Sequence, residues 1–567
     1  MYIERVPNRN SRPAILLREG WREGKKTCKR TIANLTNWPE EKIEALRLLL
    51  AGEPMVSARD AFVVERTVPH GHVEAVLGTI KSLRLDSIIF SKRCRQRDLV
   101  VAMIAERLIH PCSKLATTRF WHTTTLAEQL SVADADEEDL YEAMDWLLAR
   151  QSRIEKKLAA RHLLEGSLVL YDVTSSYYEG RTCPLARFGH NRDSKKGKLI
   201  IVYGLLTDEA GRPVAVEVYP GNTADPSTVP DQVEKLRKHF GLGRVVLVGD
   251  RGMLTQTQID KLKDYPGLGW ISALRSHGIR KLVNSGILQM SLFDEKNLAE
   301  IHSPEFSDER LVACYNPILA EQRQQKREKL LSATEKGLEK IAKEVARRTK
   351  TPLDKVEIGK KVGKAINRYK VGKHFAVTIK DGAFSFFRKE ESIRRESALD
   401  GIYVIRTSES AERISAEDTV RSYKRLEQVE SAIRCMKGID LLVRPIHHRT
   451  EDHVRAHIFL CMLAYYVEYH MRKVLAPLLF DDEQLDERRK RQDPVKPAKP
   501  SASARRKKTV GLTPDGLEVH SFQTLLAELA TLSRNRCRVR SDPVGPTFYE
   551  FTEPTPLQKR AFELLGV

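Results

Sequence analysis

Three acidic residues occur where the sequence pattern places functional side chains. Asp172 lies within SLVLYDVTSSYYE, an apolar strand-like run that covers 167–179, and Asp250 ends the apolar run VVLVGD. Glu430 lies in a segment with helical periodicity. The separations along the chain are 78 and 180 residues, so only a folded core can bring these carboxylates together.

Three convergent carboxylates suit one particular chemistry. Mg²⁺ and Mn²⁺ prefer hard oxygen ligands, and they keep water and phosphate oxygens in their coordination shells. Two such ions about 3.5–4 Å apart can activate an attacking oxygen and stabilise the leaving oxygen during phosphoryl displacement. An isolated Asp at a strand end is more commonly a turn residue, so the interpretation depends on all three acids together. We therefore predict that Asp172, Asp250 and Glu430 are catalytic and hold two divalent ions.

The segments around the acids predict an α/β fold. Their order is strand, strand, strand, helix, strand, helix, strand, which is that of a ribonuclease H-like core with a mixed sheet flanked by helices. In such a core the first and fourth strands are neighbours, so Asp172 and Asp250 should converge, and a glutamate on a helix can reach them. The strands are expected at 167–179, 198–208, 213–221, 244–252 and 269–276, and the helices at 227–241 and 256–265.

Changes of pattern divide the rest of the chain. Short strands and then helices form an N-terminal region that is expected to bind DNA or to mediate dimerisation, although a plain packing role for the helices is equally compatible with their pattern. An α+β insertion domain interrupts the core, with a charged helix at 322–348 and a second helix near 353–368 that folds back on it. The predicted bounds are 1–160 for the N-terminal region, 161–276 and 400–475 for the catalytic core, 277–399 for the insertion domain, 476–511 for a flexible basic linker and 512–567 for a C-terminal appendage.

Charge and composition indicate the class of partner. The net charge of +20 favours a polyanion, because each neutralised phosphate releases condensed counterions. No apolar run approaches the length of a membrane span, so no membrane partner is expected. The eight cysteines include no C-x-x-C pair, which argues against a zinc ribbon. A cytoplasmic, nucleoid-associated location of the bacterial type fits these features.

A second pattern lies around the glutamate. Tyr423, Glu430 and Lys437 fit the signature Y-x2-R-x3-E-x6-K, with Leu426 at the position of the arginine. With this pattern the chain resembles the insertion-sequence DDE transposases, in the branch that carries an insertion between its second Asp and its Glu. The resemblance covers roughly 165–470, with YDVTSSYYEG at 171–180, PGNTAD at 220–225 and VGDRGM at 248–253, and it extends to LREGWREGKKTCKRTIANL at 17–35.

The resemblance implies roles for the residues near the three acids. Tyr423 and Lys437 would bind the terminal phosphates of a DNA end, and Arg251 would lie beside the second metal ligand. Arg425 or Arg434 would take over the phosphate contact of the missing arginine. Positions seven residues apart share one face of a helix, which agrees with these roles, although such a stripe taken alone is more often a solvated face.

The function that follows is DNA transposition. The resemblance implies an enzyme that binds terminal inverted repeats, cleaves DNA and joins the 3′-hydroxyl ends to target DNA, acting as a homodimer in a synaptic complex. One alternative is a ribonuclease H-like nuclease or resolvase without strand transfer. Another is a DNA-binding protein derived from a transposase that has lost catalysis, which the presence of all three acids disfavours.

A group of histidines raises the question of a zinc site. The pair His453 and His457 is spaced by one helical turn, but H-x-x-x-H lacks the glutamate of the metalloprotease pattern. We predict no metal here, and expect a helix whose Arg455 and His457 face DNA or the core. The full group is His447, His448, His453 and His457.

Overall fold

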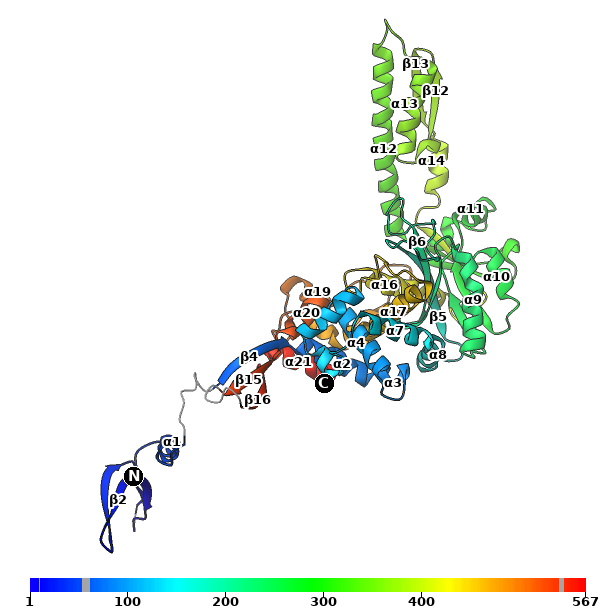
Figure 1. Cartoon of the computed structure of the whole chain (residues 1–567). Coiled ribbons are helices and arrows are strands. Elements are labelled where there is room, and N and C mark those ends of the chain that lie inside the picture. The colour runs from blue at the N-terminus through cyan, green and yellow to red at the C-terminus, as the bar shows by residue number, and fades with distance from the viewer. Residues whose placement is uncertain (10, 54–61, 540–544) are drawn as a thin grey trace. The chain divides into compact units, whose positions relative to one another are not determined.

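The structure is a computed structural model that describes residues 1–9, 11–53, 62–539 and 545–567, in two compact units (Figure 1). The first unit comprises Met1–Val68 and Ser533–Glu553, and the second comprises Pro69–Leu532 and Pro554–Val567. The N-terminal region predicted at 1–160 is therefore divided between two units, and so is the appendage predicted at 512–567. The sequence did not predict this division into two units, because pairing between strands near the two ends of the chain leaves no local pattern in the sequence.

The first unit contains two three-stranded sheets. One has the order β1-β2-β3 and is closed by helix α1 over a small core of Ile15, Leu35 and Ile43. The other has the order β16-β15-β4, so it joins the N-terminal part of the chain to the C-terminal part. The elements are β1 (Tyr2–Val6), β2 (Ala14–Glu23), β3 (Lys26–Asn34), α1 (Glu40–Leu50), β4 (Phe62–Pro69), β15 (Ser533–Val539) and β16 (Thr547–Phe551).

The second unit is built on a mixed sheet of eight strands in the order β10-β11-β14-β9-β8-β5-β6-β7. The pairs β5–β8 and β8–β9 are parallel, and the others are antiparallel. The predicted succession of strands and helices is confirmed, and the sheet is consistent with a ribonuclease H-like fold. The strands are β5 (Leu168–Tyr177), β6 (Ile200–Asp208), β7 (Pro213–Pro220), β8 (Val245–Val248), β9 (Leu268–Ala273), β10 (Leu298–Ile301), β11 (Arg310–Tyr315) and β14 (Ile402–Thr407), with helices α9 (Val229–Glu234) and α10 (Gln256–Leu262) between them.

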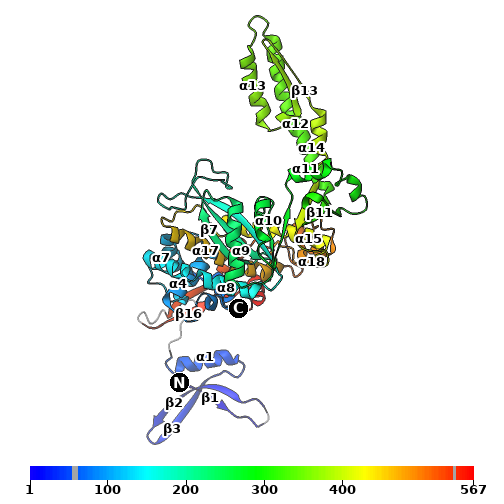
Figure 2. The same cartoon turned by 90° about the vertical axis from the view of Figure 1, so that its right-hand side faces the viewer.

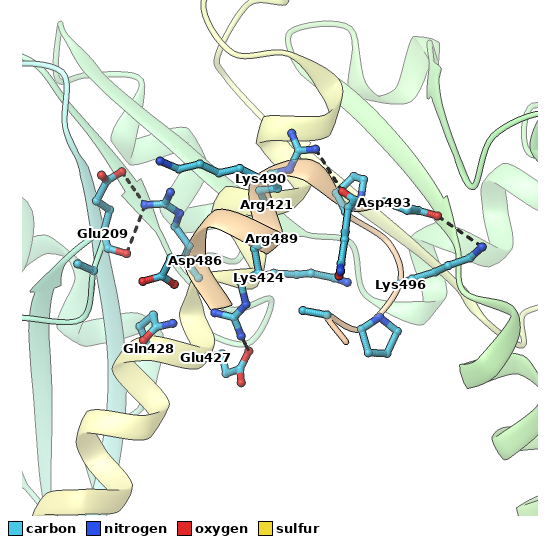
Figure 3. A pocket seen from close by; sticks show the side chains of 16 residues that line it. Glu209, Arg421, Lys424, Glu427, Gln428, Asp486, Arg489, Lys490, Asp493 and Lys496 are labelled. Carbon is cyan, nitrogen blue, oxygen red and sulfur yellow. Dashed lines mark hydrogen bonds and ion pairs between the residues drawn. The ribbon is translucent and has the colours of Figure 1, made fainter. Parts of the chain in front are cut away.

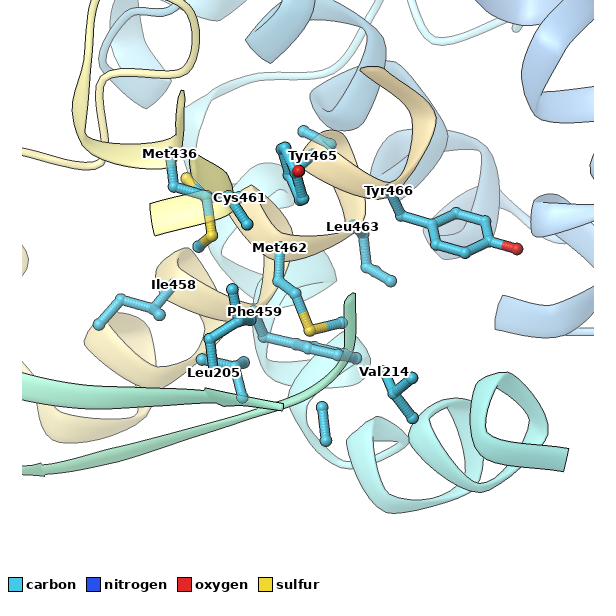
Figure 4. Packing of buried hydrophobic residues seen from close by; sticks show 14 of the residues in the cluster. Leu205, Val214, Met436, Ile458, Phe459, Cys461, Met462, Leu463, Tyr465 and Tyr466 are labelled. Carbon is cyan, nitrogen blue, oxygen red and sulfur yellow. The ribbon is translucent and has the colours of Figure 1, made fainter. Parts of the chain in front are cut away.

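Helix α17 (Glu451–Leu475) is the central helix of this unit. It is buried on nearly every side, which explains why its sequence is apolar all round rather than on one stripe. Figure 4 shows Phe459 and Met462 of this helix against Leu205 of β6 and Val214 of β7, with Met436 of α16 (Leu426–Lys437) beside them. The core therefore fixes α16 against the sheet that carries the predicted aspartates.

The other face of α17 receives the helices that precede the sheet. Contacts link α17 to α4 and to α7, and α4 to α7, so these helices are part of the core unit rather than a separate domain. The helices are α2 (Gly71–Ser82), α3 (Leu85–Ile89), α4 (Arg95–Ile109), α5 (Lys114–Phe120), α6 (Leu126–Gln129), α7 (Glu137–Leu148) and α8 (Gln151–His162).

The segment predicted as an insertion domain at 277–399 has two parts. Its first part, after α11 (Ser276–Asn284), adds β10 and β11 to the core sheet. Residues 317–397 form a lobe with its own apolar core, which we call the inserted lobe (Figure 2). The lobe contains the predicted helical hairpin, and its elements are α12 (Pro317–Arg347), α13 (Lys355–Arg368), β12 (Phe375–Lys380), β13 (Ala383–Arg388) and α14 (Glu390–Ser397).

The segment predicted as a flexible linker, 476–511, is folded instead. It contains α18 (Leu485–Arg491) and α19 (Ala502–Val510), and Val495 is fully buried. The Lys507 ammonium is buried as well, and it donates to the backbone oxygen of Ala476 at 2.9 Å and to Glu483 at 2.6 Å. The composition predicted a flexible linker, but basic side chains such as Lys507 bind residues elsewhere in the folded unit.

The chain ends with two further helices, α20 (Phe522–Ala530) and α21 (Pro556–Leu565), both of which contact α2. Among the residues that the structure describes, no helix is both long enough and apolar enough to cross a membrane.

Candidate active site

The sheet brings Asp172 and Asp250 to the same level. Strands β5 and β8 are parallel neighbours, with Leu170 opposite Val248. Asp172 lies two residues after Leu170, and Asp250 lies two residues after Val248. Because parallel strands share one register, the two carboxyl groups leave neighbouring strands side by side. The predicted convergence of the two aspartates follows directly from this pairing.

The carboxyl group of Asp172 has the electrostatic surroundings of a functional site. Burial raises its pKa to about 7, and the carboxylates of Asp250 and Glu430 act in the same direction. Two groups lower the pKa of Asp172: the backbone N–H of Val173, which donates to Asp172 Oδ1 at 2.8 Å, and the charge of Arg192. Their effect is smaller than that of burial and the two carboxylates. The structure thus brings together the three acids that the sequence singled out.

Glu430 and Tyr423 reach this place from two helices. The segment predicted to be helical around Tyr423 and Glu430 is divided at Arg425, where α15 (Ala416–Lys424) ends and α16 begins. Burial raises the pKa of Tyr423 to about 12, the Asp250 and Glu430 carboxylates also raise it, and Arg251 lowers it. The Tyr423 phenol therefore keeps its proton and can donate a hydrogen bond beside the acids.

The three acids fit a site for Mg²⁺ or Mn²⁺. Asp250 Oδ1 accepts hydrogen bonds from the backbone N–H groups of Gly252 and Met253, both at 2.8 Å. In the described part of the chain, the Oδ2 atoms of Asp172 and Asp250 accept no hydrogen bond, so each can bind a cation. The ligand oxygens of the trio do not all lie within 4.8 Å of one another. Hard carboxylate oxygens are the ligands that Mg²⁺ and Mn²⁺ prefer, which is the chemical basis of the fit.

Lys437 anchors α16 to strand β5. Its ammonium lies 2.6 Å from Asp193 Oδ1, and it donates to the backbone oxygen of Ser175 at 2.7 Å and to Thr174 Oγ1 at 3.2 Å. Burial lowers the pKa of Lys437, and Asp193, which also pairs with Arg444, opposes that shift. The structure gives Lys437 an internal partner, whereas its predicted phosphate contact stays a prediction.

The predicted arginines lie in different surroundings. Arg251 is exposed beside Tyr423, and Arg434 is exposed on α16. Arg425 instead lies 2.7 Å from Glu209 Oε2, in a cavity of about 300 Å³ between α15, α16 and the segment around α18 (Figure 3). Of the two candidates to replace the missing arginine, Arg434 has the solvent access that a phosphate contact requires.

Arg192 was missed by the sequence analysis. It lies close enough to Asp172 to lower the pKa of that carboxyl group, and it pairs with Asp225. Asp193, the anchor of Lys437, follows it directly. Arg192 and Asp193 both belong to GHNRDSKKGK at 189–198, a basic run between two predicted strands. This run is the feature of the sequence from which they could have been predicted as site residues.

A second group of possible metal ligands lies outside the site. Ligand atoms of Cys435, Asp440 and Glu468 fall within 4.8 Å of one another. Arg472 already supplies the positive charge there, since it donates to Glu468 Oε1 at 2.6 Å and lies 3.5 Å from Asp440 Oδ2. Burial and the Glu468 carboxylate raise the pKa of the Cys435 thiol far above its usual value. We interpret this group as an internal ion-pair cluster.

Two of the four histidines near α17, His448 and His457, pack against each other at the core, whereas His447 is exposed. His457 Nε2 lies 3.1 Å from the backbone oxygen of Val443, and its ring centroid lies 4.8 Å from that of His448. Burial lowers the pKa of His448 to about 3 and holds the pKa of His457 well below its usual value. Of the two environments predicted for His457, the structure shows the core.

Acid should destabilise the protein through these two histidines. The unfolded chain binds their protons below about pH 6.5, and the folded chain does not, so the stability they contribute is lost as the pH falls from 6.5 toward 3. The expected loss is about 1.4 kcal/mol per pH unit for each histidine. Urea unfolding between pH 7 and pH 5 measures the slope. His448→Gln should make the slope shallower, whereas His277→Gln, at an exposed position, should leave it unchanged. An unaltered slope in the His448 variant would contradict the assignment.

Comparison with known proteins adds the following. Residues 165–467 match the family model described as "Transposase DDE domain", and residues 3–59 match the model "IS1634 family transposase, N-terminal domain". No curated protein matches the chain. Among solved structures, it is similar to the piggyBac transposase in a synaptic complex with hairpin DNA, with 9% identity and a TM-score of 0.34, over 81% of this chain and 78% of that one.

Proposed function

The chain belongs to the DDE transposase family of insertion sequences, and from that premise we propose that it cuts DNA at the ends of a mobile element and joins the 3′-hydroxyl ends to target DNA. The observation that carries the proposal is the convergence of Asp172, Asp250 and Glu430 beside the parallel strands β5 and β8 in the interior of the mixed sheet. The DNA partners would be the terminal inverted repeats and the target, bound by a homodimer.

Each residue of the site has a role that its surroundings support. Asp172, Asp250 and Glu430 supply the ligands for two divalent ions, which when bound activate the attacking oxygen and stabilise the leaving one. The backbone N–H groups of Gly252 and Met253 hold the Asp250 carboxylate in place. The protonated Tyr423 phenol can donate a hydrogen bond to a phosphate at this position.

Two further arginines supply positive charge for the DNA. Arg251, beside Tyr423, and Arg434, exposed on α16, would contact phosphates on either side of the scissile bond. Lys437 keeps α16 against β5 through Thr174 and Ser175, with Asp193 balancing its charge, and so positions Glu430. In these assignments Tyr423 and the arginines contact DNA, whereas Lys437 acts by holding α16 in place.

The test is a strand-transfer assay on the DNA that flanks the gene. A plasmid carrying both flanks is incubated with the protein, a target plasmid and Mg²⁺ or Mn²⁺, and the products are separated on a gel. We expect excision of the element and its joining to the target, with neither product in EDTA. Cleavage without joined product would instead establish the nuclease alternative, and binding without cleavage would establish a transposase-derived DNA-binding protein.

A further inference from the structure

Positive charge is concentrated in the inserted lobe. Residues 317–397 contain 22 Lys and Arg against 11 Asp and Glu, a net charge of +11 out of +20 for the whole chain. Every residue of this segment is described by the structure. A net charge of this size in a small lobe attracts a polyanion, and the distribution of the cations shows where that polyanion would bind.

Five of these cations form one stripe along α12. Lys329, Lys336 and Lys343 are seven residues apart, and Lys340 and Arg347 fall on the same face of the helix. All five are exposed. We call this set the α12 stripe.

The α12 stripe lies opposite the side by which the helix packs. The buried residues Leu331, Leu338 and Val345 each follow a stripe lysine by two positions, which is about 200° around a helix. The stripe thus faces away from the apolar core of the lobe. Its position leaves it accessible to a partner.

The charges of the stripe are not neutralised within the lobe, whereas several other cations of the lobe are paired. Arg388 lies within ion-pair distance of Glu328 and Glu335, Lys361 pairs with Glu344, and Arg327 pairs with Asp400. In this fully described lobe, none of the five stripe cations forms an ion pair or a side-chain hydrogen bond. A solvated helix face usually carries both signs of charge, but the carboxylates of α12 lie beside the stripe rather than within it.

We propose that the α12 stripe is a docking surface for the phosphate backbone of duplex DNA. From Lys329 to Arg347 the stripe spans about 27 Å, at about 1.5 Å per residue. That length matches about eight base pairs of duplex at about 3.4 Å each. A row of ammonium groups on a straight helix suits a regularly charged backbone and carries no means of reading bases. The inference rests on the proposed function, because it gives a second contact to the DNA that the active site would cut.

The test compares two triple variants of the full chain that remove equal charge. One is Lys336→Gln with Lys340→Gln and Lys343→Gln, on the stripe. The matched control is Lys355→Gln with Lys380→Gln and Lys389→Gln, at exposed positions of the same lobe outside α12. Gln and Lys have similar helix propensities, so helix α12 should be retained in the stripe variant.

Binding is measured by fluorescence anisotropy with a labelled duplex of about 20 base pairs, longer than the stripe, at several KCl concentrations in EDTA. The slope of log K against log salt should become shallower by about 2.7 in the stripe variant, at about 0.9 for each lost phosphate contact. Affinity at low salt should fall by about tenfold or more. For the control, the slope of log K against log salt should equal that of the unmodified chain to within about 0.9, the change expected for one phosphate contact.

Two outcomes would overturn the docking surface. One is a stripe variant that binds like the unmodified chain, and the other is a control that loses as much affinity as the stripe variant, which would show an effect of net charge alone. Because the assay excludes divalent ions, it is independent of cleavage. If the unmodified chain bound no duplex at all, the proposed function itself would fail.

Discussion

Replacing Glu430 with Gln is expected to lower DNA cleavage by about 10³-fold or more while DNA binding persists. The change keeps the size of the side chain and removes one of three carboxylates that act on one another at the candidate site. Loss of a metal ligand there would remove several kcal/mol of transition-state stabilisation, and about 4 kcal/mol corresponds to about 10³-fold in rate. Cleavage of end-labelled DNA in Mg²⁺ measures the rate. Asp172→Asn and Asp250→Asn should have effects of the same size.

Glu427 provides the matched control for this experiment. It lies on the same helix, one turn before Glu430, and it is also exposed, but it pairs with Arg489 at 2.9 Å and lines the separate cavity of Figure 3. Glu427→Gln should therefore leave the cleavage rate within about twofold of the unmodified chain, because lost surface ion pairs cost little. If Glu430→Gln retained the same activity as Glu427→Gln, the glutamate of the trio would have to be another residue.

Replacing Asp193 with Ala is expected to destabilise the second unit by about 3–5 kcal/mol. The Asp193 side chain is 1% exposed, and it neutralises Lys437, whose side chain is 9% exposed. It also accepts a hydrogen bond from the backbone N–H of Tyr177 at 3.0 Å. The substitution leaves a buried ammonium without its carboxylate, which costs far more than the loss of a surface pair. Urea unfolding followed by circular dichroism measures the change.

The comparison for Asp193 is the surface pair of Asp308 and Lys263. Those side chains are 72% and 45% exposed, so Asp308→Ala should leave the stability close to that of the unmodified chain. Lys437→Met, which removes the buried charge together with its need for a partner, should cost less than Asp193→Ala. An Asp193 variant as stable as the Asp308 variant would show that Lys437 finds another partner.

The core sheet and its two aspartates were predictable because their signals are local. Strands buried on both faces are continuous apolar runs, and the run ending at Val248 could be read directly from the chain. That β5 and β8 are neighbours could be expected from the ribonuclease H-like topology, and the register that places Asp172 beside Asp250 comes from the structure. Glu430 needed a further pattern around it, since a glutamate on a helix has no distinctive local signal.

Other features depend on contacts between distant parts of the chain. The pairing of Lys437 with Asp193 joins positions far apart in sequence, so the lysine could be predicted only as a surface group. The folding of 476–511 depends on partners such as Ala476 and Glu483 for Lys507, whereas its composition indicated a linker. The pairing of β4 with β15 joins opposite ends of the chain, so the division into two units could not be predicted from either end.

The inserted lobe leaves and re-enters the sheet at adjacent points. Tyr315 of β11 is paired with Ile402 of β14, so the whole lobe occupies the place of a hairpin turn. The pairing of β11 with β14 therefore does not depend on the length of the chain between them, because lengthening a loop costs little entropy. During evolution, domains of different size and charge could be exchanged at this junction while the strands of the catalytic sheet keep their register. Substrate preference could then diversify without any change to the residues that carry the chemistry.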